Sequence, residues 1–64
     1  MSEIDGVLRL LDKEWRGIEE IRRRSNLRVE QLTQVLRFLA KFELAELDET
    51  LGRARLGPAG RHEL

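Results

Sequence analysis

RRRSNLRVEQLTQVLRFLAKF, residues 22–42, carries the pattern from which the fold of this chain is predicted. It holds six basic residues and one acidic residue, a net charge of +5, whereas residues 1–21 carry −3 and residues 43–64 carry −2. Ser25 and Asn26 interrupt the stretch, and Asn tolerates the left-handed conformation that a tight turn needs. The stretch therefore predicts a turn between two helices, with basic residues on both sides of the turn.

The helix after this turn is predicted over residues 29–42 by the spacing of its apolar residues. One face repeats at intervals of three and four residues, as the buried face of an amphipathic helix does. That face consists of Leu32, Val35, Leu36 and Leu39. The opposite face is polar and mostly basic, and consists of Glu30, Gln34, Arg37 and Lys41. The helix therefore buries one face and presents the other to solvent or to a partner.

The helix before the turn is predicted over residues 18–24, with Ile18 and Ile21 facing inward. Two glutamates lie in its first turn and three arginines, Arg22, Arg23 and Arg24, in its last. Acids near the amino end and cations near the carboxyl end of a helix both interact favourably with its dipole. The distribution of charge therefore supports this helix.

A further helix is predicted over residues 3–14, with Ser2 and Asp5 in the positions of a capping box. Its apolar stripe consists of Ile4, Val7, Leu8, Leu11 and Trp15. Gly17 breaks the helical pattern, so Trp15 and Arg16 are expected to form a very short strand or an extended turn.

After the last helix the apolar period changes to that of a β-hairpin over residues 44–56. Leu44 and Leu47 indicate a first strand, and Asp48-Glu49-Thr50-Leu51-Gly52 a turn. Residues 53–56 alternate polar and apolar, as a half-buried strand does. Residues 57–58 end the hairpin, and residues 59–64 are expected to form a short tail or a single helical turn.

The composition limits the classes of protein to consider. A chain of 64 residues predicts a single domain, and the absence of cysteine excludes disulfides and thiolate metal sites. No apolar run approaches the roughly 18 residues of a membrane span, and no signal peptide is recognised, so a cytoplasmic protein is expected. Ten of the twelve basic residues are arginine, whose planar fork suits phosphate and guanine edges. A high-GC genome or a hot growth environment would give the same bias.

Three helices followed by a hairpin resemble the winged helix-turn-helix fold, as found in small archaeal and bacterial transcription regulators. The resemblance covers nearly the whole chain and is carried by short motifs: Glu20-Ile21 in the second helix, Leu27 and Leu32 around the turn, Leu36 and Leu39 at the end of the third helix, Leu44-Ala45 before the wing, and Leu56-Gly57-Pro58-Ala59-Gly60-Arg61 at the close. Two positions depart from the family pattern. Glu43 replaces the usual glycine after the third helix, which suggests a different helix cap, and Arg28 replaces the usual Ser or Thr N-cap.

The resemblance implies that the third helix enters the major groove of double-stranded DNA and that the hairpin, the wing, lies along the adjacent backbone or minor groove. It places Gln34 and Arg37 at base edges and Arg28 and Lys41 at phosphates. Arg53 and Arg55 would add backbone or minor-groove contacts, and residues 22–24 phosphate contacts beside the turn. The alternative for each of these residues is an ordinary solvated helix face.

Several residues favour a protein-binding adaptor instead. Acidic Glu30 lies on the outward stripe, and Asp48 and Glu49 lie at the tip of the wing, where they would repel phosphate. Leu10, Phe38 and Phe42 lie away from the core stripes and would form an interface for a protein partner or a homodimer if they are exposed. The competing expectation is that Phe38 and Phe42 complete the core against the hairpin, because so small a domain needs its aromatic residues.

An enzyme is not expected. The single histidine, His62, lies in the tail without a catalytic partner, and the sequence-adjacent acids do not converge on one site. We see no metal-ligand spacing, no phosphate-binding glycine loop and no sign of a small-molecule or cofactor site. The polar face of the first helix is acidic, which disfavours a membrane-surface helix.

Overall fold

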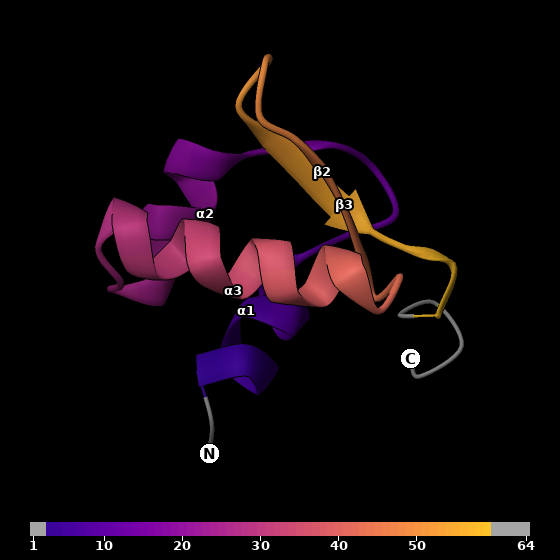
Figure 1. Cartoon of the computed structure of the whole chain (residues 1–64). Coiled ribbons are helices and arrows are strands. Elements are labelled where there is room, and N and C mark those ends of the chain that lie inside the picture. The colour runs from indigo at the N-terminus through magenta and orange to yellow at the C-terminus, as the bar shows by residue number, and fades with distance from the viewer. Residues whose placement is uncertain (1–2, 60–64) are drawn as a thin grey trace.

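The computed structural model describes residues 3–59, which fold into three helices and three short strands (Figure 1). Their order is α1 (Glu3–Leu10), β1 (Arg16–Gly17), α2 (Ile18–Ser25), α3 (Val29–Lys41), β2 (Ala45–Asp48) and β3 (Arg53–Leu56). The predicted order of three helices and a hairpin is confirmed. Ser2 and the predicted tail residues 60–64, with Arg61 and His62, lie outside the described range.

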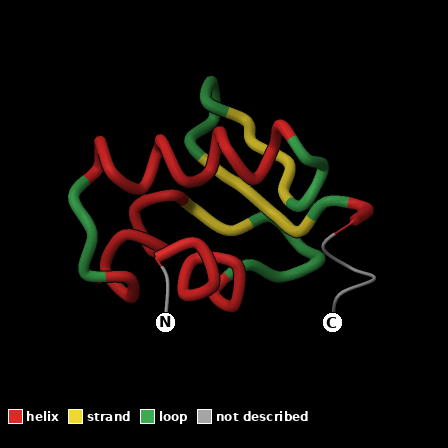
Figure 2. Tube along the Cα trace, turned by 60° about the horizontal axis from the view of Figure 1, so that its bottom comes forward, coloured by secondary structure: helices red, strands yellow, loops and turns green. Residues whose placement is uncertain are grey.

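The three strands form one antiparallel sheet in the order β1-β3-β2. Figure 2 shows them side by side, next to α3. In the hairpin, Ala45 pairs with Leu56 and Asp48 with Arg53, and in the shorter ladder Arg16 pairs with Ala54. The apolar residues Ala45, Ala54 and Leu56 are buried, so the inner face of the sheet packs against the helices.

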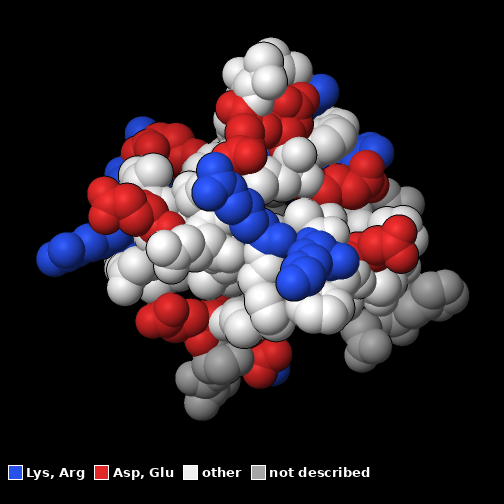
Figure 3. Space-filling model, in the orientation of Figure 1, with Lys and Arg blue, Asp and Glu red and all other residues white. Residues whose placement is uncertain are grey.

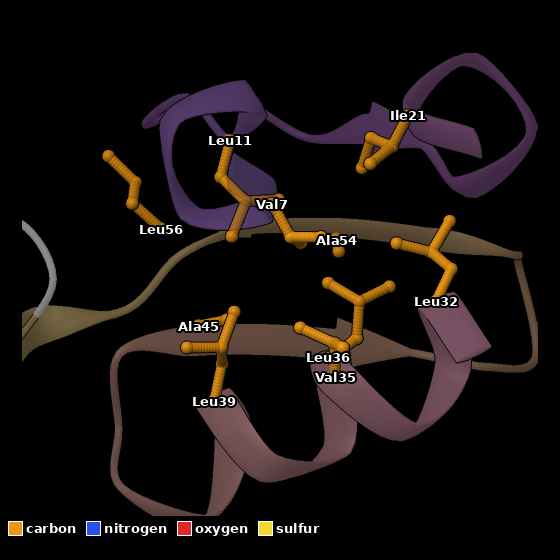
Figure 4. Packing of buried hydrophobic residues seen from close by; sticks show 10 residues of the cluster. All are labelled: Val7, Leu11, Ile21, Leu32, Val35, Leu36, Leu39, Ala45, Ala54 and Leu56. Atoms are coloured by element: carbon orange, nitrogen blue, oxygen red, sulfur yellow. The ribbon is translucent and has the colours of Figure 1, made fainter. Parts of the chain in front are cut away.

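The core is formed by side chains from all three helices and from the sheet. In Figure 4 they converge from α1 and α2 on one side and from α3 on the other. The buried set is Val7, Leu11, Ile21, Leu32, Val35, Leu36, Leu39, Ala45, Ala54 and Leu56. The apolar face predicted for α3 is confirmed in full. No polar or charged side chain is buried among the described residues, so the core is held together by apolar burial alone.

The first helix ends earlier than predicted, at Leu10 instead of residue 14. The N–H of Leu56 donates a hydrogen bond of 2.8 Å to the carbonyl of Asp12, which an α-helix over residues 3–14 would turn away from the sheet. The chain therefore leaves the helix to run beside β3. Of the two forms expected at Trp15 and Arg16, the very short strand is found, one residue later than predicted, at Arg16–Gly17.

Trp15 does not belong to the apolar stripe of the first helix, and this part of the prediction is wrong. Continuing the β1–β3 register by one residue places Trp15 opposite Arg55, on the outer face of the sheet. The guanidinium carbons of Arg53 and Arg55 each lie 4.4 Å from the centroid of its ring. The indole therefore packs beneath two cations instead of in the core.

The turn between α2 and α3 has the conformation that its sequence predicts. Asn26 is left-handed, with φ of 61°, and its N–H donates to the carbonyl of Arg22 at 3.1 Å. The N–H of Arg28, at the start of α3, donates to Oε1 of Gln31 at 3.2 Å. Gln31 thus supplies the half of a capping box that satisfies the N–H of the N-cap residue. An arginine side chain has no acceptor for the other half.

The carboxyl end of α3 is capped in the same way as helices that end in glycine, and the expected different cap is not found. The N–H of Leu44 donates to the carbonyl of Leu39 at 2.9 Å, and that of Glu43 to Ala40 at 3.1 Å. This pair of bonds defines a Schellman motif, whose left-handed residue is usually glycine. Here Glu43 adopts it, with φ of 61°.

Candidate nucleic-acid interface

The residues around the α2–α3 turn form a cluster of free cations. Arg23, Arg24 and Arg28 are exposed, and none of them has an ion-pair partner within residues 3–59. Helix α2 ends and α3 begins between them, so three guanidinium groups lie close together along the chain. Arginines without an ion-pair partner attract polyanions.

Arg22 differs from its two neighbours because it is held within its own helix. Its Nε donates to Oε1 of Glu19 at 2.9 Å. This hydrogen bond lowers the pKa of Glu19 and raises that of Arg22. Of the three consecutive arginines predicted to contact phosphate, Arg22 is thus already engaged by a carboxylate.

The outward face of α3 is exposed at Glu30, Gln34, Arg37 and Lys41, as its polar stripe predicts. Arg37 is bonded to the hairpin turn, because its Nη2 and Nε donate to Oε1 of Glu49 at 2.7 and 3.2 Å. Both side chains remain more than half exposed, at 63% and 53%. In water such an exposed pair stabilises a fold by at most about 1 kcal/mol. The sequence placed Glu49 at the tip of the wing but did not reveal this pairing.

The two arginines of β3 are compensated by acids of β2 on the outer face of the sheet. Arg53 Nε donates to Asp48 at 3.3 Å, and Arg55 donates through Nε and Nη2 to both carboxylate oxygens of Glu46 at 3.1 Å. Both guanidinium groups also cover the ring of Trp15. They are therefore less available to a partner than the arginines of the α2–α3 turn.

Both signs of charge are visible on the side of the molecule that α3 presents. Figure 3 shows basic and acidic side chains next to one another, with uncharged surface around them. Lys41 remains without an ion-pair partner among the described residues. Basic side chains on this side of the molecule are thus interspersed with acidic ones.

The expectation that Phe38 and Phe42 complete the core is wrong. They are 45% and 53% exposed, and their ring centroids lie 5.0 Å apart in a tilted arrangement. The four core residues of α3 already fill the space beneath the helix, so these two positions fall on its flank. Leu10 is only partly buried, and it lines a pocket of about 200 Å³ with Arg24 and Leu27. Leu10 therefore faces α2 and the turn.

Among residues 3–59 no group of three His, Asp or Glu side chains is arranged to hold a metal ion. None of the helices described here is long and apolar enough to span a membrane. No protein-family model, curated protein or solved structure matches the chain.

Proposed function

We propose that this chain is a winged helix-turn-helix domain that binds double-stranded DNA, with α3 in the major groove and the β2–β3 hairpin as the wing. The proposal is supported by the order of the elements and by the tight left-handed turn at Asn26 between α2 and α3. In proteins of this architecture the helix after the turn reads bases. Here it carries Gln34 and Arg37, which pair well with adenine and guanine edges.

One observation carries the proposal. Basic residues without an ion-pair partner lie at the α2–α3 turn and on the outward face of α3, the parts of a winged helix-turn-helix that contact DNA. Arg16, Arg22, Arg37, Arg53 and Arg55 each form an ion pair. Arg23, Arg24, Arg28 and Lys41 have no such partner within residues 3–59. In a chain of zero net charge, free cations at the turn and on the outward face of α3 provide the phosphate contacts.

A titration of labelled random duplex at low and moderate salt tests this function. Removal of one cation that binds a phosphate reduces the slope of log affinity against log salt by about 0.9. Arg28→Ala is expected to reduce it by that amount. The matched control is Arg9→Ala, which removes from α1 one exposed arginine that has no ion-pair partner among the described residues. Absence of binding at low salt, or an equal decrease in slope for the two variants, would contradict the proposal.

A second candidate, a winged-helix adaptor for a protein partner or a second copy, is favoured by the exposed Phe38–Phe42 pair. Aromatic residues are enriched at interfaces, and exposed apolar side chains that lie together mark sites of interaction. Phe38→Glu should then abolish complex formation seen by sedimentation. Val29→Glu is the control, because Val29 is similarly exposed, at 52%, on the same helix. Equal behaviour of both variants and the unchanged chain would remove the form of this candidate in which the partner is a second copy.

A further inference from the structure

We propose that Glu49 is a specificity-determining residue, which makes Arg37 a reader of guanine instead of a phosphate anchor. This inference rests on the proposed DNA binding and assigns a role within it. Glu49 belongs to the wing and Arg37 to the outward face of α3, so the pair joins the two parts of the molecule that would flank a DNA groove.

The two hydrogen bonds from Arg37 to Glu49 leave the outer end of the guanidinium, with both Nη1 protons and the second Nη2 proton, free for a base. Arg37 gives Nε–H and one Nη2–H to a single oxygen of Glu49. A guanidinium has five N–H groups, so both protons of Nη1 and the second proton of Nη2 remain. A bidentate contact to guanine needs two neighbouring N–H donors, directed at O6 and N7. Glu49 thus fixes one edge of the fork and leaves the outer end for a base.

The charge of Glu49 discriminates between the two kinds of DNA acceptor. A phosphate bound to Arg37 would lie close to the Glu49 carboxylate, and like charges at that distance repel strongly where water is excluded. The acceptors of guanine carry no net charge, so they can share Arg37 with the carboxylate. The pair therefore weakens sequence-independent binding by Arg37 while keeping base recognition.

The wing holds Glu49 in place by contacts on both sides of it. Asp48 Oδ1 accepts the N–H of Leu51 at 3.1 Å, which closes the turn. Gly52, with φ of 64°, accepts the N–H of Ile18 at 2.8 Å and so ties the turn to the start of α2. Arg37 is thus oriented by an acid whose own backbone is anchored.

The test measures affinity, salt dependence and base preference for four variants with a library of short randomised duplexes. The full chain is expected to prefer guanine at one position by about tenfold or more, the size of a bidentate contact, and Arg37→Ala should lose this preference. Glu49→Ala should bind unselected duplex more tightly, with a salt slope steeper by about 0.9 as Arg37 turns to phosphate, and with a preference several-fold smaller. Glu49→Gln keeps an acceptor without the charge and should restore part of the preference.

Glu30→Ala is the matched control, because Glu30 is an exposed acid on the same face of α3 and has no ion-pair partner within residues 3–59. It should tighten binding and leave the preference intact. An undiminished guanine preference in Glu49→Ala, or equal changes in Glu49→Ala and Glu30→Ala, would overturn the role of Glu49 and leave DNA binding standing. If the full chain binds duplex but shows no guanine preference that depends on Arg37, the role of Glu49 is likewise overturned and DNA binding still stands. Failure of all forms to bind duplex at low salt would overturn both proposals.

Discussion

Gly57 and Glu43 approach so closely that a Cβ atom at position 57 would lie 2.4 Å from the carbonyl oxygen of Glu43. The same segment is joined by hydrogen bonds, from Gly57 N–H to the carbonyl of Leu44 at 2.9 Å and from Ala59 N–H to that of Glu43 at 3.0 Å. The end of α3 is thus locked to the chain that follows β3. Glycine is required here by close contact with backbone, which has little freedom to move aside.

Gly57→Ala is therefore expected to destabilise the fold by about 1–3 kcal/mol, the usual cost of an overpacked site. Gly6→Ala is the control, since nothing lies within 4 Å of its Cβ position in α1. There the change should stabilise by about 0.5–1 kcal/mol, because alanine loses less backbone entropy in a helix. Urea unfolding followed by circular dichroism measures both, and a shift of the same sign in the two variants would refute the close-contact argument.

Glu43→Gly is expected to stabilise the fold by about 1 kcal/mol, because a left-handed conformation strains every residue with a Cβ. For a domain of this size that gain raises the melting temperature by about 4–8 °C. Asn26→Gly provides the comparison, since Asn26 has the same φ of 61° but asparagine tolerates it better. Thermal unfolding should show the larger increase for Glu43→Gly; the reverse order would mean that Glu43 makes a compensating contact.

Leu36→Ala is expected to leave most of the chain unfolded at room temperature. Leu36 is fully buried, and such truncations cost about 2–5 kcal/mol, comparable to the roughly 3–5 kcal/mol that a core of this size supplies. Leu51→Ala removes the same atoms from a side chain that is 64% exposed, and should change stability by less than about 0.5 kcal/mol. The two circular dichroism spectra decide between these outcomes, and a folded Leu36→Ala would show that the core tolerates the cavity.

Acid should destabilise the domain partly through Asp12. A hydrogen bond from Arg16 at 2.9 Å, aided by the backbone N–H of Lys13, lowers the pKa of Asp12 from the ordinary value of an aspartate. Because the folded-state pKa is the lower one, the stabilisation is complete above the unfolded value and is lost as the pH falls through the folded value. Unfolding midpoints at about pH 6 and about pH 3 should therefore differ less in Asp12→Asn than in the unchanged chain.

Glu30→Gln serves as the control for this pH dependence, since Glu30 has no ion-pair partner among the described residues. It should retain the full difference between the two midpoints. If Asp12→Asn retains it too, the bond from Arg16 does not contribute to stability in solution.

The helices and the hairpin could be predicted because their signals are local. Apolar spacing located α3 to within a residue, and Asn26 marked the turn before it. The end of α1 could not be found in this way, since it depends on the bond between Asp12 and Leu56, which are far apart in sequence. Trp15 fitted the helical period equally well, but pairing with β3 moved it to the outer face of the sheet.

The residues of the candidate interface were likewise predicted in part from the sequence, and the rest depend on tertiary packing. Periodicity, turn residues and charge are properties of neighbouring positions, so they predicted which elements form and that basic residues gather around the α2–α3 turn. Which cations stay free and which aromatic rings stay exposed depends instead on how the elements pack together. Arg37 pairs with Glu49 and Phe38 is exposed to solvent, because the hairpin packs on one side of α3 and leaves the other side uncovered. This arrangement results from burial of the apolar side chains of all the elements in one core.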